Sequence, residues 1–277
     1  MTGWSRETPW KQGQVLPDEA VAELGLRSAN SPEKTLVVVI SHDCDLAASP
    51  EKEPNVEVII GQEIESLNGN FTHAKTARVL HLSFFAESGR RGVELRAARK
   101  TVIAKSDLVA FQPRRDLSLD PQGHSILQRW LAARYRRAAF PDAFERRLNE
   151  SGAAMRLSKV LVAVGKHITA IFFDIDEGRE IQHSGPEDTY TLAVVLLYTS
   201  EPGGRQSESV VLKAKEQIEN VFRELFFKDG SWKNIELREC MVISDEALTY
   251  AQSLMLKQWR LEHLSLREEP PQSVMEQ

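Results

Sequence analysis

The chain has 277 residues, of which 42% are hydrophobic and 27% are charged, and its formal net charge is −5. This composition is typical of a globular protein with a proper core, and the acidic balance argues against a protein that coats nucleic acid without specificity. The two cysteines, Cys44 and Cys240, are far apart in the sequence and indicate reduced thiols. The N-terminus has no signal-peptide pattern and the apolar runs are too short to span a bilayer, so we expect a cytoplasmic protein without a membrane partner.

Short strands with Gly and Pro turns dominate the N-terminal part of the chain. A short amphipathic helix opens at Pro17, ahead of a series of β-branched or alternating segments. Strands are expected at residues 35–40, 56–61, 77–85 and 93–103. Together they predict a small β-barrel-like domain over residues 1–112.

The first of these strands ends in a group of chemically capable side chains. Ser41, His42, Asp43, Cys44 and Asp45 directly follow the apolar run. Strand ends and the loops after them are where rigid scaffolds usually present functional groups. We therefore take His42, Asp43, Cys44 and Asp45 as the candidate catalytic residues.

This group has three interpretations. If the strand continues through it, Asp43 and Asp45 share one face and could hold a divalent cation such as Mg²⁺ or Mn²⁺. His42 and Cys44 would share the other face, as a thiolate nucleophile beside an imidazole or as part of a zinc site that lacks further ligands. In the third interpretation the Ser and Asp side chains cap a turn, and Cys44 packs as a small hydrophobe.

From Gly123 onward the pattern becomes helical and rich in arginine. Apolar side chains at helical spacing predict a basic helical connector over residues 113–150. Arginine with interleaved aromatic residues is the combination that binds a phosphate backbone and unstacked bases. The alternative is a solvated helix whose apolar stripe packs the two domains together. The candidate nucleic-acid-binding residues are Arg129, Trp130, Arg134, Arg136 and Arg137.

The remainder predicts an α+β layer domain over residues 151–267, so the whole chain is expected to be α+β. A tail at residues 268–277 is expected to be disordered. Helices are expected at residues 154–164, 207–227 and 245–259, and strands at residues 168–176, 190–200 and 235–243.

A second pair of carboxylates, Asp174 and Asp176, lies two residues apart on an expected strand. The local string resembles the metal-binding strand of palm-type nucleotidyl cyclases and polymerases. Those folds need a second acidic turn on a neighbouring strand, and the segment 190–200 carries none. We therefore expect this strand to run out of the core into a polar loop.

The order of the N-terminal pieces resembles the small barrel of the MazF/PemK toxins. The similar segments are WKQGQVLP, EKTLVVVIS, EVIIG and GVELRAARKTVIAKSDL, within residues 8–110. The resemblance implies a barrel and ribonuclease activity on single-stranded RNA, for which that family uses an arginine before the second strand and a threonine near the third. Lys34 stands where that arginine would be, and Thr72 or Thr76 is only loosely placed to match the threonine. The group of residues 41–45 is not part of the family pattern, so the barrel could be shared while the chemistry differs.

The sequence has no phosphate-binding loop, no dinucleotide-binding glycine motif and no zinc-protease motif, which argues against those three classes of enzyme. Three hypotheses for function remain. The leading one is a cytoplasmic bacterial protein of toxin or phage-defence type that engages and cuts nucleic acid, with Asp43 and Asp45 in the reactive site. The alternative is a non-enzymatic partner subunit of a larger defence complex, in which residues 41–45 only cap a turn. It would dock another protein through Trp130, Trp232 and Trp259 or through the basic helix. The third is a hydrolase or transferase that acts through Cys44. The sequence contains no base-reading motif that decides between RNA and DNA.

Overall fold

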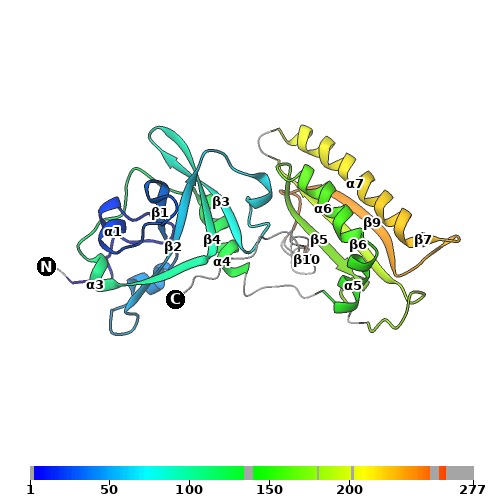
Figure 1. The fold of residues 1–277 in the computed structure, drawn as a ribbon, viewed down its shortest axis with the longest axis horizontal. Helices are drawn as coiled ribbons and strands as arrows, with labels where there is room; N and C mark the ends of the chain where they lie inside the picture. Colours follow the sequence, from blue (N-terminus) through cyan, green and yellow to red (C-terminus); the bar gives the residue numbers. More distant parts are fainter. Residues whose placement is uncertain (1–2, 134–139, 180, 201–202, 250–255, 260–277) are drawn as a thin grey trace. The chain divides into compact units, whose positions relative to one another are not determined.

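The computed structural model describes residues 3–133, 140–179, 181–200, 203–249 and 256–259. The chain divides into two compact units, Met1–Tyr135 (unit 1) and Arg136–Gln277 (unit 2), and each is described by itself (Figure 1). The division falls within the segment that the sequence predicts as a helical connector. In both units helices accompany a mixed or antiparallel sheet, which agrees with the expected α+β class.

Unit 1 is built on an open four-stranded antiparallel sheet with the order β1-β2-β4-β3. Its strands are β1 (Thr35–Val39), β2 (Asn55–Ile64), β3 (Val79–Ala86) and β4 (Gly89–Ala104). The expected barrel-like closure is not confirmed, because β1 and β3 lie at opposite edges of the sheet. A register shift between Ile59 and Gly61 interrupts the pairing of β2 with β4.

Strand β1 is buried on both faces, which explains its continuous run of β-branched and aliphatic residues. Val37 and Val39 face a core that also holds residues of α1 (Asp18–Glu23), α2 (Asp43–Ala47) and α3 (Lys105–Leu108). Leu36 and Val38 face the opposite core, together with Leu127 and Trp130 of α4 (Pro121–Ala133). Two short 3₁₀ turns, η1 (Pro32–Lys34) and η2 (Gly69–Phe71), precede β1 and β3.

An N-terminal segment runs alongside β1 and brings residue 12 to the end of that strand. Gly13 donates its backbone N–H to the carbonyl of Val39, and Val39 donates to the carbonyl of Gln14. Gly13 adopts a φ of +84°, and a Cβ at this position would lie 2.8 Å from the ring of His124. Glycine therefore permits both the turn and the close approach of this segment to α4.

Unit 2 contains a four-stranded sheet with the order β10-β5-β6-β9. Its strands are β5 (Ile168–Ile175), β6 (Tyr190–Tyr198), β9 (Ile235–Ser244) and the two-residue β10 (Lys257–Gln258). Strands β6 and β9 are parallel, and the crossover between them is the long helix α7 (Gly204–Phe226). A small hairpin, β7 (Phe227–Lys228) and β8 (Ser231–Trp232), follows α7.

Helices cover one face of the unit 2 sheet (Figure 1). These are α5 (Asp142–Glu150), α6 (Ala153–Ala163) and α7. Helix α7 buries Val211, Ala214, Ile218 and Phe222, the stripe that its sequence predicts. The expected layer arrangement is therefore present in this unit.

One expectation near the C-terminus is wrong, and two others, in the connector and the tail, fall outside the described residues. Residues 257–258, expected at the end of a helix, pair with β5 as strand β10. The expected tail at residues 268–277 lies outside the described residues, as do Arg134, Arg136 and Arg137. No helix within the described ranges has both the length and the apolar character that a membrane crossing needs.

Candidate functional site

The group of polar residues after β1 begins a short helix. His42 is the N-cap of α2, and its Nδ1 accepts the backbone N–H of Cys44 at 3.4 Å. Residues two apart in an α-helix point about 200° away from each other. Asp43 and Asp45 therefore do not share a face, as they would in a continued strand.

The C-terminal end of α2 is anchored by a buried lysine. Lys105 Nζ donates to the carbonyls of Asp45 at 2.7 Å and Ala48 at 2.8 Å. Trp4 Nε1 donates to the carbonyl of Leu46 at 2.8 Å, and the Lys105 ammonium lies 5.4 Å from the centre of the Trp4 ring. Burial lowers the pKa of Lys105, against the opposing charges of nearby carboxylates. The lysine satisfies carbonyls that the end of a helix leaves without partners.

Two of the polar side chains hold backbone groups in place. Ser41 Oγ accepts the backbone N–H of Glu57 at 2.7 Å, and Asp43 Oδ1 accepts the backbone N–H of Gln12 at 2.8 Å. These bonds agree with the capping interpretation of the segment. Cys44, in contrast, is exposed and does not pack as a small hydrophobe.

A pocket of about 500 Å³ lies beside α2, entirely within unit 1. Glu57 of β2 and Lys100 of β4 line the pocket from the same face of the sheet. Lys100 pairs with Ile59 on the neighbouring strand, and Glu57 lies two residues before Ile59, so all three side chains point to one face. His42 and Asp45 come from the α2 segment, and three residues of α4 close the pocket. The lining residues are Gln12, Ile40, His42, Asp45, Glu57, Lys100, Gln128, Leu131 and Ala132.

The pocket collects the groups that acid–base chemistry on an anionic ligand requires. Asp45 and Glu57 offer carboxylates, Lys100 offers an ammonium and His42 offers an imidazole. Because Nδ1 of His42 accepts a hydrogen bond, the proton of the neutral ring is carried by Nε2. His42 can therefore donate from Nε2 without releasing the helix cap.

The fit of a divalent cation to Asp43 and Asp45 is poor. Asp43 Oδ1 already accepts the N–H of Gln12, and the two carboxylates point in different directions. In the part of the chain that the structure describes, no three His, Cys, Asp or Glu side chains are grouped as metal ligands. We derive no chemical step through a metal.

The two cysteines differ in environment. Cys44 is exposed on α2, whereas Cys240 is buried in β9, and burial raises the pKa of its thiol to about 12. Cys240 is therefore an inert packing residue. His42 reaches the backbone of Cys44 rather than its thiol.

The expected nucleic-acid-binding helix contributes one exposed arginine within the described residues. Arg129 is exposed on α4, three residues before the pocket residue Ala132, so both lie on adjacent positions of one helix face. Trp130 is only 1% exposed in the core of unit 1, so its ring offers no face for stacking on a base. Of the expected pair of a basic and an aromatic side chain on this helix, only Arg129 is exposed and able to contact nucleic acid.

The threonines that the toxin resemblance singles out are engaged locally. Thr72 Oγ1 donates to the carbonyl of Gly69 at 2.9 Å, and Thr76 Oγ1 donates to the carbonyl of Val79 at 2.5 Å. Between them, Lys75 is buried, and burial lowers its pKa to about 7. Lys34 lies exposed in η1. Neither threonine lines the pocket described above.

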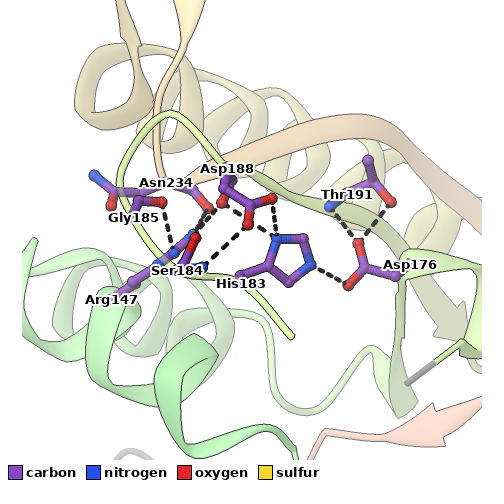
Figure 2. A network of polar contacts seen from close by, with 8 residues as sticks. All are labelled: Arg147, Asp176, His183, Ser184, Gly185, Asp188, Thr191 and Asn234. Carbon is purple, nitrogen blue, oxygen red and sulfur yellow. Dashed lines mark hydrogen bonds and ion pairs between the residues drawn. The ribbon is translucent and has the colours of Figure 1, made fainter. Parts of the chain in front are cut away.

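Unit 2 contains a second polar cluster, the His183 network (Figure 2). His183 lies between Asp188, whose Oδ1 is 2.8 Å from Nδ1, and Asp176, whose Oδ2 is 2.9 Å from Nε2. Asp176 Oδ1 also accepts the backbone N–H and the hydroxyl of Thr191. The side chains of His183 and Asp176 are each only 4% exposed.

Arg147 of α5 completes the His183 network. Its guanidinium donates to the carbonyls of Gly185, Asp188 and Asn234, each at 2.8 Å (Figure 2). The guanidinium also lies 4.8 Å from the centre of the Tyr190 ring. This arginine lies within the basic helical connector that the sequence predicts over residues 113–150. In the structure its donors bind backbone carbonyls.

Burial and hydrogen bonding act in opposite directions on His183. Burial lowers its pKa, whereas the hydrogen bonds and charges of Asp176 and Asp188 raise it, and the pKa lies above its usual 6.5. The backbone at Asp176, Glu177 and Gly178 is left-handed, with φ of 52°, 56° and 75°. The side-chain bonds of Asp176 hold this unfavourable turn in place.

Four of the pocket residues are not predicted as site residues from the sequence, namely Gln12, Glu57, Lys100 and Gln128. Gln12 lies in a turn, and the other three are ordinary polar residues of β2, β4 and α4, so no sequence pattern marks them as site residues. Comparison with protein-family models, with curated proteins and with solved structures finds no match to this chain. The pocket in unit 1 is the candidate site because it is open to a ligand, whereas the polar groups of the His183 network bind one another.

Proposed function

We propose that unit 1 binds single-stranded nucleic acid and cuts it at the pocket beside α2, in a bacterial toxin or phage-defence role. The observation that carries this proposal is the convergence of His42, Asp45, Glu57 and Lys100 on one pocket of about 500 Å³. This volume is within the range of small-ligand sites.

Each charged group has a task in this proposal. Lys100 in the pocket and Arg129 on the adjacent helix face bind phosphate oxygens, which offsets the two carboxylates of the pocket. His42 donates from Nε2 to a further phosphate oxygen. These contacts would hold a phosphodiester next to Glu57.

The proposed cleavage is a displacement at phosphorus. The Glu57 carboxylate takes the proton of an attacking hydroxyl, whose oxygen forms a bond to phosphorus. The bond from phosphorus to the leaving oxygen breaks, and that oxygen takes a proton from water. Lys100 neutralises the charge that develops on the phosphoryl oxygens.

The first test measures cleavage by the full chain of labelled single-stranded RNA and DNA, separated on gels. We expect Glu57→Gln to lower the cleavage rate by about 100-fold or more, because the base is lost, while binding is retained. The matched control is Glu51→Gln, an exposed glutamate outside the pocket. Equal rates for wild type and Glu57→Gln would remove the catalytic part of the proposal.

The second test measures the salt dependence of binding by fluorescence anisotropy. Arg129→Ala should reduce the slope of log K against log salt by about 0.7, the value for one phosphate contact on a single strand. Arg27→Ala, at an exposed arginine elsewhere in unit 1, should leave the slope unchanged. If the wild-type chain binds neither RNA nor DNA, the proposal fails.

The partner-subunit alternative loses two of its expected anchors. Trp130 and Trp259 are 1% and 4% exposed, so both are core residues of their units rather than surface anchors. A stoichiometric protein that co-purifies with a chain unable to bind nucleic acid would favour this alternative.

A further inference from the structure

The carboxamide of Gln128 in the pocket is held in one orientation by a hydrogen bond, and it has a further acceptor and donor that this bond does not use. Gln128 Nε2 donates to Gln12 Oε1 at 3.0 Å, and Gln12 Nε2 donates to the carbonyl of Ile40 at 2.8 Å. Both glutamines line the pocket. The two bonds form a relay that begins at a backbone carbonyl and ends at the Gln128 carboxamide.

The direction of this relay is fixed by chemistry. A backbone carbonyl can only accept, so the Gln12 amide must present Nε2 to Ile40 and Oε1 to Gln128. Gln128 must then present Nε2 to Gln12. Within the described residues its Oε1 and its second N–H make no further hydrogen bond, so an adjacent acceptor and donor are available to a ligand.

Gln12 itself is held firmly. Its side chain is buried, with the residue 6% exposed, and its backbone N–H donates to Asp43 Oδ1 at 2.8 Å. The next residue is Gly13, where any side chain would meet His124 and Leu119 at 2.8 and 2.9 Å. Asp43 therefore acts at the site through Gln12, although its own carboxylate does not line the pocket.

The surroundings of Gln128 suit a flat ligand with an amino group. Ile40, Leu131 and Ala132 supply an apolar wall, and the carboxylate of Asp45 can accept a hydrogen bond from an exocyclic amine. A carboxamide pairs in two-point fashion with an adenine edge, whose amino group donates and whose ring nitrogen accepts.

We propose that Gln128 reads the edge of an adenine base in the pocket, and that Gln12 is the positioning residue that orients its carboxamide. This inference rests on the proposed binding of single-stranded nucleic acid and adds a base preference to it. It makes Gln128 a determinant of specificity, while phosphate contacts supply the general affinity.

The test uses the full chain and labelled oligouridines of about nine nucleotides, a length within the range of single-strand sites. Each carries one central adenine, cytosine, guanine or uracil. We expect the adenine oligonucleotide to bind about ten-fold more tightly than the others, which is within the range of one two-point base contact. Gln128→Leu should abolish this preference, because leucine fills similar space without a donor or an acceptor.

The matched control is Gln122→Leu, the same change at an exposed position of α4 outside the pocket, which should keep the preference. Gln12→Leu should weaken the adenine preference, because the carboxamide of Gln128 then loses the acceptor that orients it. Equal wild-type binding of all four oligonucleotides, or an adenine preference that survives Gln128→Leu, would overturn the inference and leave the proposed function standing. Binding of none of them would instead remove the proposed function.

Discussion

The two polar clusters of this chain differ in what they leave available. In the pocket of unit 1, Gln128 keeps an unused acceptor and donor, and the side chains of His42, Asp45 and Glu57 belong to exposed residues. In the His183 network of unit 2, the imidazole uses both nitrogens, and Asp176 binds through both oxygens. The first arrangement can take a ligand, whereas the second is complete without one.

The pocket and the His183 network should therefore respond differently to substitution, one through binding and the other through stability. Buried polar groups that satisfy one another stabilise a fold, and removing one of them leaves the others unpaired at a cost. Exposed groups around a pocket contribute little to stability, because water satisfies them when the pocket is empty. Substitutions in unit 2 should therefore act on folding, and substitutions in the pocket should act on binding.

The largest expected effect is that of Arg147→Ala. It removes the donors of three backbone carbonyls and should lower the stability of unit 2 by about 3 kcal/mol. Hydrogen exchange of the β5 and β6 amides measures this loss without interference from unit 1. Arg146→Ala, at the exposed neighbour, should change stability by less than about 0.5 kcal/mol. Similar effects for the two arginines would show that the network is not structural.

A smaller effect is expected from pH, through His183. Its pKa is raised above 6.5 in the folded state, so its contribution to stability is fully present below about pH 6.5 and is lost as the pH rises through the folded pKa. A neutral ring carries one N–H and can donate to only one of its two carboxylates. The measurement is unit 2 stability between mildly acidic and mildly basic pH, for wild type and His183→Gln. Identical pH profiles would contradict this account of the network.

The smallest effect, close to zero, is expected from Cys44→Ser. Cys44 is exposed, makes no side-chain bond to His42 and does not line the pocket. Stability, nucleic-acid binding and cleavage should all match wild type within error. Loss of cleavage in this variant, or after alkylation of a chain that carries Cys240→Ser, would favour the cysteine-dependent hypothesis over the proposed function.

The sequence predicts the regular elements well where local pattern determines them. The β-branched run of β1, the alternation of β3 and the apolar stripe of α7 all appear where expected. The closed barrel is not confirmed, because closure depends on which strands lie at the sheet edges, and no local pattern specifies that. The segment that starts at Asp43 forms a helix because a polar N-cap and a distant lysine stabilise it.

The candidate site was predictable only in part. His42 and Asp45 could be chosen from sequence because four reactive side chains follow a strand. Gln12 and Gln128 could not, because the hydrogen bond between them joins residues that are 116 positions apart. Arg147 shows the converse case, since a basic side chain of the predicted connector donates to backbone carbonyls of its own chain.

The buried ammonium of Lys105 makes the local opening of α2 measurable by chemical labelling. An amine-acylating reagent can reach Nζ only when the end of α2 detaches, because the lysine is fully buried and bonded to two carbonyls there. The thiol of Cys44 on the same helix is exposed and reacts without any opening. The ratio of the two labelling rates, after correction for intrinsic reactivity, therefore reports the free energy of local opening of the helix that carries Asp45.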